Sequence, residues 1–128
     1  MNVQKLREVY EAYISCLNAQ DWPSLKLYVA EDAQHNGQRL GVDGYRDMLI
    51  RDYQQIPDLQ FKIGLLVVEP PVVASRLDFD CTPVGQFLGL PINGRNIRFS
   101  ENVFYEFSGN KISKVWSVLD KAGIEAQL

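Results

Sequence analysis

The sequence has 128 residues, of which 46% are hydrophobic and 23% are charged, and these values are typical of a single globular domain that buries a core. Its 13 Lys and Arg residues against 16 Asp and Glu residues give a formal net charge of −3. Nucleic acids and anionic membranes require a basic surface patch on their partners. Because no run of Lys and Arg occurs, the composition argues against both.

The sequence also argues against a membrane span, a signal peptide and a metal centre. No stretch approaches the roughly 18 consecutive apolar residues of a transmembrane helix, and the N-terminal segment MNVQKLREVYEAY is charged and helical in pattern. Cys16 and Cys81 lie far apart without CxxC spacing, and there is one histidine, so we expect two buried thiols and no metal site. We therefore expect a cytoplasmic protein with one domain over residues 1–128.

Helical patterns fill the first half of the chain. Residues 3–20 carry apolar side chains at three- and four-residue steps, which predicts a helix with one apolar face. Asp21 can cap a short second helix with Pro23 in its first turn, and this helix is expected to bury Leu25, Leu27, Tyr28 and Val29. After the extended stretch AEDAQHNGQRLG, a third helix is predicted at about 43–55, and it ends before Pro57.

From residue 59 the apolar period changes to two, which predicts strands over 59–69, 72–81, 96–107 and 111–120. The segment TPVGQFLGLPINGR is predicted to form a loop between the second and third of these strands. Helices followed by antiparallel strands indicate an α+β fold, and we expect a cone-shaped, curved antiparallel sheet wrapped around the N-terminal helices. Such a cone is not filled by its own side chains, so it can enclose a pocket.

Glu101 interrupts an apolar strand face. The other odd positions of strand 96–107 are Ile97, Phe99, Val103, Tyr105 and Phe107. If this face lines the pocket, burial raises the pKa of the Glu101 carboxyl and suits it to acid/base chemistry. The alternatives are a β-bulge that switches the face, or an ion pair with Arg98 or Arg95.

Asp120 closes the last predicted strand. If that strand keeps an unbroken period of two, the residues on one face are Ile112, Lys114, Trp116, Val118 and Asp120. Asp120 then lies at the rim or floor of the pocket beside the large apolar ring of Trp116. The alternative is that Asp120 caps a C-terminal helix, although Gly123 stands where a capping box has Glu or Gln.

His35 is the only histidine, and it ends the extended stretch that follows the second helix. A neutral imidazole there can donate one hydrogen bond and accept another near physiological pH, whereas the simpler interpretation is a structural hydrogen-bonding group. Tyrosines at helical spacing, Tyr13 and Tyr45 among them, are expected mostly in the core, although one hydroxyl could bind a substrate oxygen.

Taken in order, four segments resemble the SnoaL-like polyketide cyclases, within the nuclear-transport-factor-two-like superfamily of cone-shaped α+β domains. The segments are HNGQRLGVDGYRDML, IPDLQFKI, VVASRLDFDCTPVGQFLGLPINGRNIRF and FSGNKISKVWSVLDKAGIEAQL. They show a His before a Gly-rich turn, a Pro-Asp before the first long strand, a Thr-x-x-Gly-x-Phe-x-Gly loop, a Gly-Asn-Lys-Ile turn and a Trp followed by an Asp. The resemblance covers roughly residues 5–128.

The resemblance implies specific roles. The Asp after the Trp in the closing strand is the acid/base residue of the family, which here is Asp120, and the early His that lines the pocket is His35. Characterised cyclases close a ring by intramolecular aldol condensation without a metal or organic cofactor, because the conjugated polyketide stabilises its own enolate. The fold commonly forms a homodimer through the outer face of the sheet. This sequence has Pro83 where many relatives carry His.

The first hypothesis is a cofactor-independent enzyme that binds a hydrophobic carbonyl compound and uses Asp120 as its acid/base residue. His35 and Glu101 would orient the carbonyl oxygen, and the other expected substrate-binding residues are Trp116, Phe99, Phe79, Tyr13 and Met48. The second hypothesis is a non-catalytic ligand-binding or dimerisation module of the same fold. An isomerase, or an epoxide hydrolase with an Asp-Arg-Asp arrangement, is a third option.

Overall fold

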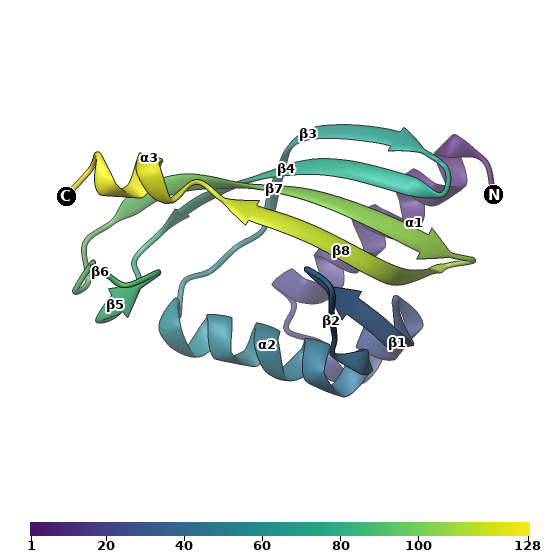
Figure 1. Ribbon diagram of the computed structural model, residues 1–128, viewed down its shortest axis with the longest axis horizontal. Helices are drawn as coiled ribbons and strands as arrows, with labels where there is room; N and C mark the ends of the chain where they lie inside the picture. Colours follow the sequence, from purple (N-terminus) through teal and green to yellow (C-terminus); the bar gives the residue numbers. More distant parts are fainter.

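The computed structural model describes all residues from Met1 to Leu128 (Figure 1). Its helices are α1 (Val3–Asn18), the 3₁₀ helix η1 (Trp22–Leu27), α2 (Gly41–Gln55) and α3 (Lys121–Glu125). Its strands are β1 (Val29–His35), β2 (Gln38–Arg39), β3 (Lys62–Glu69), β4 (Val72–Cys81), β5 (Gln86–Phe87), β6 (Leu90–Pro91), β7 (Ile97–Ser108) and β8 (Lys111–Leu119). The predicted helices and long strands are present, and the predicted loop contains the short β5–β6 hairpin.

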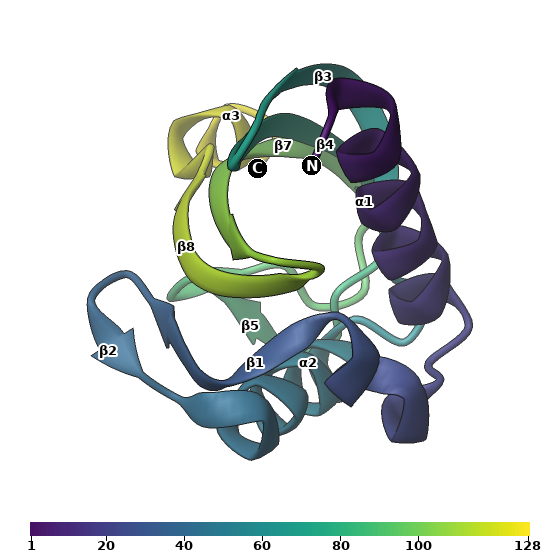
Figure 2. The same cartoon turned by 90° about the vertical axis from the view of Figure 1, so that its right-hand side faces the viewer.

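Six strands form one sheet in the order β2-β1-β8-β7-β4-β3. All neighbours are antiparallel except β1 and β8, which pair in parallel. Figure 2 shows the long strands curving around an interior that α1 covers on one side and that β1 and α2 cover below. The expected α+β cone is therefore confirmed, with the extended stretch before α2 added to the sheet as β1 and β2.

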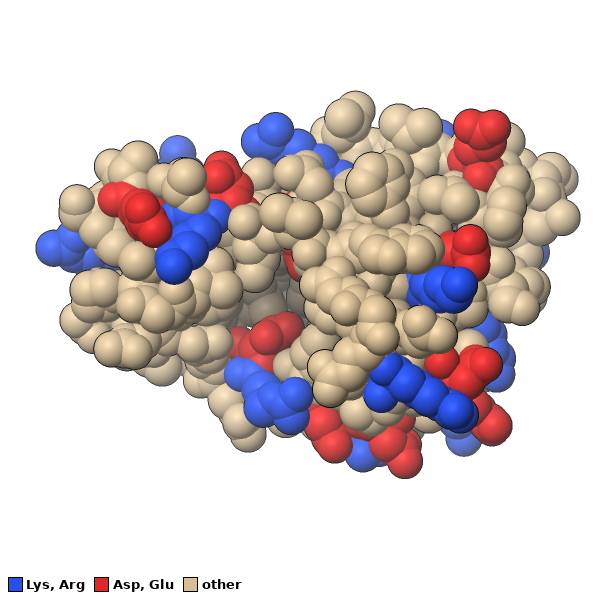
Figure 3. Space-filling model, viewed as in Figure 1, with Lys and Arg blue, Asp and Glu red and all other residues tan.

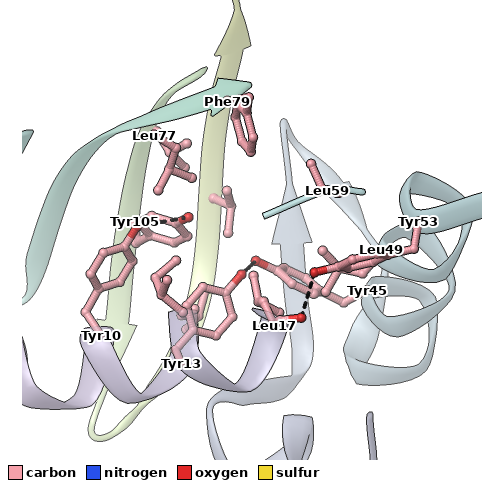
Figure 4. Packing of buried hydrophobic residues seen from close by; sticks show 14 of the residues in the cluster. Tyr10, Tyr13, Leu17, Tyr45, Leu49, Tyr53, Leu59, Leu77, Phe79 and Tyr105 are labelled. Atoms are coloured by element: carbon pink, nitrogen blue, oxygen red, sulfur yellow. Dashed lines mark hydrogen bonds between the residues drawn. The ribbon is translucent and has the colours of Figure 1, made fainter. Parts of the chain in front are cut away.

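The interior is filled from the inner face of the sheet and from the apolar stripes of α1 and α2, which together form one cluster of 27 buried residues. The predicted stripe of α1 is buried at Leu6, Tyr10, Tyr13, Ile14 and Leu17 (Figure 4). The prediction for the second helix is wrong at Leu27, which is 58% exposed. A 3₁₀ helix repeats every three residues, so Trp22, Leu25 and Tyr28 share the inward side and Leu27 does not.

One extra residue in β8 decides which side chains of that strand face inward. Glu106 of β7 pairs with Lys114, but the next residue, Phe107, pairs with Ile112, so Ser113 is a β-bulge. The Ser113 hydroxyl donates a 2.9 Å hydrogen bond to the carbonyl oxygen of Glu106 and thereby occupies the disrupted position. Beyond the bulge the parity is inverted: Val115, Ser117 and Leu119 face inward, and Trp116 and Val118 face outward. The expectation of an unbroken period of two in this strand is wrong for that reason.

The end of α1 is fixed to the start of the sheet by one side chain. The Asn18 amide nitrogen donates to the Phe61 carbonyl oxygen at 2.9 Å, and the Asn18 amide oxygen accepts from the Phe61 backbone N–H at 2.7 Å. Both backbone groups are partly buried, and these two bonds satisfy them.

Asn18→Ala leaves both Phe61 backbone groups without their partner, so we expect the free energy of unfolding to fall by about 2 kcal/mol. Urea denaturation followed by circular dichroism measures this change. Ser15→Ala, at an exposed position of the same helix, is the matched control and should stay within about 0.5 kcal/mol of the wild type. Equal stability of the two variants would show that the bidentate contact contributes nothing.

Candidate functional site

A cavity of about 220 Å³ lies between the inner face of the sheet and α2. Figure 3 shows the hollow that opens on this side of the molecule, with acidic side chains at its rim. Its walls come from elements far apart in the sequence, and the polar groups on them are Tyr13 (α1), His35 (β1), Asn36 (the turn after β1), Tyr45 and Asp52 (α2), Glu101 and Tyr105 (β7) and Ser117 (β8). An apolar hollow with a few convergent polar groups is the usual form of a small-molecule site.

A second, apolar hollow of about 70 Å³ continues from the first. The two share Asp52, Phe61, Glu101 and Leu119 as walls, so both carboxyl groups lie where the hollows meet. The residues that only the second hollow has are all apolar, and they are Ile56, Leu59, Phe79, Phe87 and Phe99. The rings of Phe79 and Phe99 are stacked with centroids 5.0 Å apart, so this end offers flat aromatic surfaces to a ligand.

Glu101 points inward from the middle of β7, between Phe99 and Val103 on the same face. Neither of the two alternatives considered from the sequence, a β-bulge at Glu101 or an ion pair with Arg98 or Arg95, is present. The β4–β7 register is continuous from Ile97 to Glu106, so no bulge turns the side chain outward, and Arg98 pairs with Asp80 on the outer side. Burial raises the pKa of the Glu101 carboxyl, and a hydrogen bond from the Ser117 hydroxyl offsets part of that rise.

Asn36 holds Ser117 in place from the turn that follows β1. The Asn36 amide oxygen accepts from the Ser117 N–H at 2.8 Å, and its amide nitrogen donates to the Ser117 carbonyl oxygen at 3.2 Å. Asn36 also has φ 48°, a left-handed conformation that Asn tolerates, and this turn carries the chain from β1 into β2. The contact from Asn36 through Ser117 to Glu101 therefore fixes the orientation of the buried carboxyl.

Asp52 is the functional candidate that the sequence analysis missed. Burial, and to a smaller extent the negative charge of Glu101, raise the pKa of its carboxyl to about 7, and the positive charge of Arg51 offsets part of the rise. The signal was present: Tyr45, Met48 and Leu49 lie seven, four and three residues before Asp52, on the same helical face. A carboxylate on an apolar helix face is the helical equivalent of Glu101 on its strand.

His35 ends β1, opposite Val115 of β8, and lies on the cavity wall. Burial lowers the pKa of its imidazole, which keeps the ring neutral at physiological pH. A neutral ring can donate one hydrogen bond and accept another, as the sequence analysis expects.

Asp120 and Trp116 do not lie in this cavity. Asp120 is exposed and caps α3, because its side chain accepts a 3.0 Å hydrogen bond from the Gly123 N–H. Trp116 is 44% exposed on the outer face, opposite Phe104. The expectation that both share the cavity of His35 is wrong, because the Ser113 bulge inverts the strand. Asp120 instead lines a separate hollow of about 560 Å³, together with Arg76 and Arg98. The glycine at position 123 has a structural explanation, because a Cβ at this position would overlap the Asp120 carboxylate.

The remaining predicted site residues share the interior. Tyr13, Met48, His35 and Glu101 line the larger hollow, and Phe79 and Phe99 line the apolar one. No group of three or more His, Cys, Asp or Glu side chains is arranged to hold a metal ion. None of the helices combines the length and the apolar character that a membrane crossing requires.

The profile of the SnoaL-like polyketide cyclase family matches residues 7–128. The chain belongs to this family. A SnoaL-like polyketide cyclase structure from Agrobacterium tumefaciens strain C58 is 47% identical to this family member, with a TM-score of 0.95 over 99% of this chain and 98% of that chain. No curated protein matches the sequence.

More distant structures share the fold of this family member. TsrD from Streptomyces laurentii is 22% identical, with a TM-score of 0.85 over 99% of this chain and 96% of that chain. AclR from Streptomyces galilaeus is 16% identical, with a TM-score of 0.79 over 98% of this chain and 96% of that chain. At these identities the likeness shows the fold, and the chemistry has to be argued from the cavity.

The raised pKa of Asp52 makes the stability of the folded protein pH-dependent. Because this pKa is about 7 in the folded state and about 4 in the unfolded chain, the folded state binds the proton more tightly between these values. The free energy of unfolding therefore falls as the pH rises from about 4 to about 7, and Glu101 contributes with the same sign.

Asp52→Asn removes the carboxyl that has to ionise inside the cavity. We expect a flatter pH profile of the unfolding free energy and a variant more stable than the wild type at about pH 8, by at most roughly 4 kcal/mol. Urea denaturation across this pH range is the measurement, with Asp47→Asn at an exposed position of α2 as control. Parallel profiles for the wild type and Asp52→Asn would mean that Asp52 is solvated in the folded protein.

Proposed function

We propose that this protein is a cofactor-independent acid/base enzyme that enolises a hydrophobic carbonyl compound, as the first step of an aldol-type cyclisation or of an isomerisation. The observation that carries the proposal is the Glu101 carboxyl, which protrudes from an apolar strand face into a cavity shared with Asp52 and His35. A carboxylate with few water neighbours is a stronger base than one in water, which suits it to the removal of a proton from carbon. Membership of the SnoaL-like polyketide cyclase family supports the same class of chemistry.

The two carboxyl groups have complementary roles in this proposal. Glu101 is the group with a hydrogen-bond donor beside it, from Ser117, and this bond favours its ionised form. The charge on Glu101 in turn favours the protonated form of Asp52. Glu101 therefore removes the proton alpha to the carbonyl group, and Asp52 returns a proton to the product, with the pair titrating as a coupled unit.

The walls of the cavity define the class of substrate. The apolar hollow beside Phe79 and Phe99 suits a planar hydrocarbon or aromatic portion, and the carboxyl groups stand at its mouth. The neutral His35 ring lies on the wall of the larger hollow, where it can orient a second polar group of the ligand. An enolisable ketone with a flat apolar ring fits this arrangement, with its ring in the apolar hollow and its carbonyl group among the polar residues of the larger hollow.

Glu101→Gln keeps the size of the side chain and its bond to Ser117 but removes the base. With β-tetralone as the probe, we expect wild-type protein to catalyse exchange of the alpha hydrogens for deuterium, measured by proton NMR in D₂O. Glu101→Gln should lower this rate by about 10²- to 10⁴-fold.

The matched control for this exchange is Asp120→Asn, which keeps a favoured cap residue on α3 and should exchange at the wild-type rate. If Glu101→Gln exchanged the alpha hydrogens of β-tetralone as fast as the wild type, the proposed role of Glu101 as the base would be contradicted. If the wild type binds β-tetralone without accelerating exchange, the protein is a ligand-binding module and the catalytic proposal fails.

The outer face of the sheet supports a second proposal, a homodimer. Val67, Ala74, Phe104 and Trp116 lie side by side across β3, β4, β7 and β8, and three of the four are at least 44% exposed: Val67, Phe104 and Trp116. Leu65 and Val118, 61% and 69% exposed, lie at the two ends of the next row on the same face, with Arg76 and Asn102 between them. An exposed apolar row of this kind can pair with the same row of a second copy about a two-fold axis, and that copy would cover it.

Phe104→Glu places a charge at the centre of this outer row. We expect wild-type protein to sediment as a dimer at micromolar concentration and Phe104→Glu to sediment as a monomer, because pairing two copies would bury two unpaired carboxylates. Leu27→Glu changes an exposed leucine in η1, outside this row of the sheet, and should remain dimeric. A wild type that is monomeric at every concentration tested would exclude this assembly.

A further inference from the structure

Two tyrosine hydroxyls meet on the wall of the larger hollow. Tyr13 comes from α1 and Tyr45 from α2, their side chains are almost fully buried, and their hydroxyl oxygens are 2.6 Å apart (Figure 4). Each hydroxyl carries one proton, and the bond between the two uses only one of them. Neither hydroxyl makes another hydrogen bond within the protein, so the pair retains one O–H donor without a protein acceptor.

The electrostatic surroundings keep this donor protonated. Burial is the main cause that raises the pKa of both tyrosines, and the charge of Glu101 raises both further. The two groups therefore remain neutral donors at physiological pH, and they share the cavity with the Glu101 carboxyl without bonding to it. A base and a separate neutral donor on the walls of one cavity are the two groups that formation of an enolate requires.

We propose that the Tyr13–Tyr45 pair donates a hydrogen bond to the carbonyl oxygen of the substrate and stabilises the enolate. This inference rests on the proposed function. The Glu101 carboxylate takes the proton from the alpha carbon, the C–H electron pair forms a carbon–carbon double bond, and the carbonyl π electrons move to the oxygen. That oxygen gains negative charge and accepts the tyrosine hydrogen bond, while the tyrosine keeps its proton.

The pairing of the hydroxyls strengthens the donor. The tyrosine that faces the substrate also accepts a hydrogen bond from the other, and such a chain polarises the outer O–H group. A donor placed where charge develops, in a site with little water, contributes more than it would in solution. The substrate class follows: with this donor, the cavity can also enolise ketones whose enolate lacks the extended conjugation of the polyketides that the family resemblance implies.

The same core contains a matched comparison. Tyr10 and Tyr105 also place their hydroxyls together, with 3.5 Å between the oxygens. Tyr10 is fully buried but does not line either hollow. Tyr10→Phe therefore removes a buried tyrosine hydroxyl of the same kind from a residue that lines neither hollow. Its partner Tyr105, which lines the larger hollow, keeps its own hydroxyl, so Tyr10→Phe is the control for Tyr13→Phe and Tyr45→Phe.

The test uses pentafluorophenolate, a planar ring with an anionic oxygen, as an analogue of the enolate. The background is Glu101→Gln, which imitates the neutral base after proton transfer, at a pH just below that at which Asp52 ionises. Fluorine NMR or calorimetry gives the dissociation constant. We expect Glu101→Gln to bind the phenolate, and Glu101→Gln with Tyr13→Phe and Tyr45→Phe to bind it at least about ten-fold more weakly. Glu101→Gln with Tyr10→Phe should bind within about two-fold of the background.

Equal affinity of the background and the doubly tyrosine-substituted variant, or no binding by the background, would overturn the proposal. If the double substitution prevents folding, each single Tyr→Phe substitution leaves one hydroxyl and should weaken binding by a smaller factor, and no loss in either would overturn it. Phenolate binding requires no turnover, whereas exchange of β-tetralone tests Glu101 with both tyrosines intact. The phenolate experiment can therefore reject the tyrosine donor while the exchange experiment still supports Glu101 as the base, and the reverse.

Discussion

The structure depends on the alternation of side chains along β7 and β8, together with the one residue that interrupts it. The continuous register of β7 with β4 turns Glu101 inward, and the Ser113 bulge turns Ser117 inward beside it. Without that bulge, Trp116 would take the place of an inward residue and Ser117 would face outward. One inserted residue therefore decides that a hydroxyl, and not an indole ring, meets the buried carboxyl.

Two carboxyl groups in one cavity with little water lower the stability of the folded protein. Their presence therefore needs an explanation other than stability. Desolvation disfavours the charge on each, and the charge on Glu101 makes ionisation of Asp52 harder still. Ser117, fixed by Asn36, compensates part of this cost at Glu101. Groups with perturbed pKa values gathered in a cavity are a frequent property of catalytic sites, which is why the proposed chemistry is built on them.

Much of the fold follows from local patterns in the sequence. The apolar stripe of α1, the period of two after residue 59 and the resemblance to SnoaL-like cyclases predict the α+β cone, and Glu101 is visible as a carboxylate on an apolar strand face. The parallel pairing of β1 with β8 was not predictable, because it joins segments about eighty residues apart. The side of Asp120 was not predictable either: a Ser in a strand gives no sign that it is a bulge, and transfer of a family role by position carries no information on the local register. Asp52 was missed although its helix shows the same signal as β7.

The most direct test of the central claim is a carbon-detected NMR titration of the side-chain carboxyl groups. If Glu101 and Asp52 face one partly dry cavity, both titrate above the ordinary value of about 4, and replacement of Glu101 by Gln lowers the pKa of Asp52 because one source of its rise is the Glu101 charge. If both carboxyls titrate near their ordinary values and neither responds to replacement of the other, they are solvated and independent, and the account of this cavity as an acid/base site is wrong.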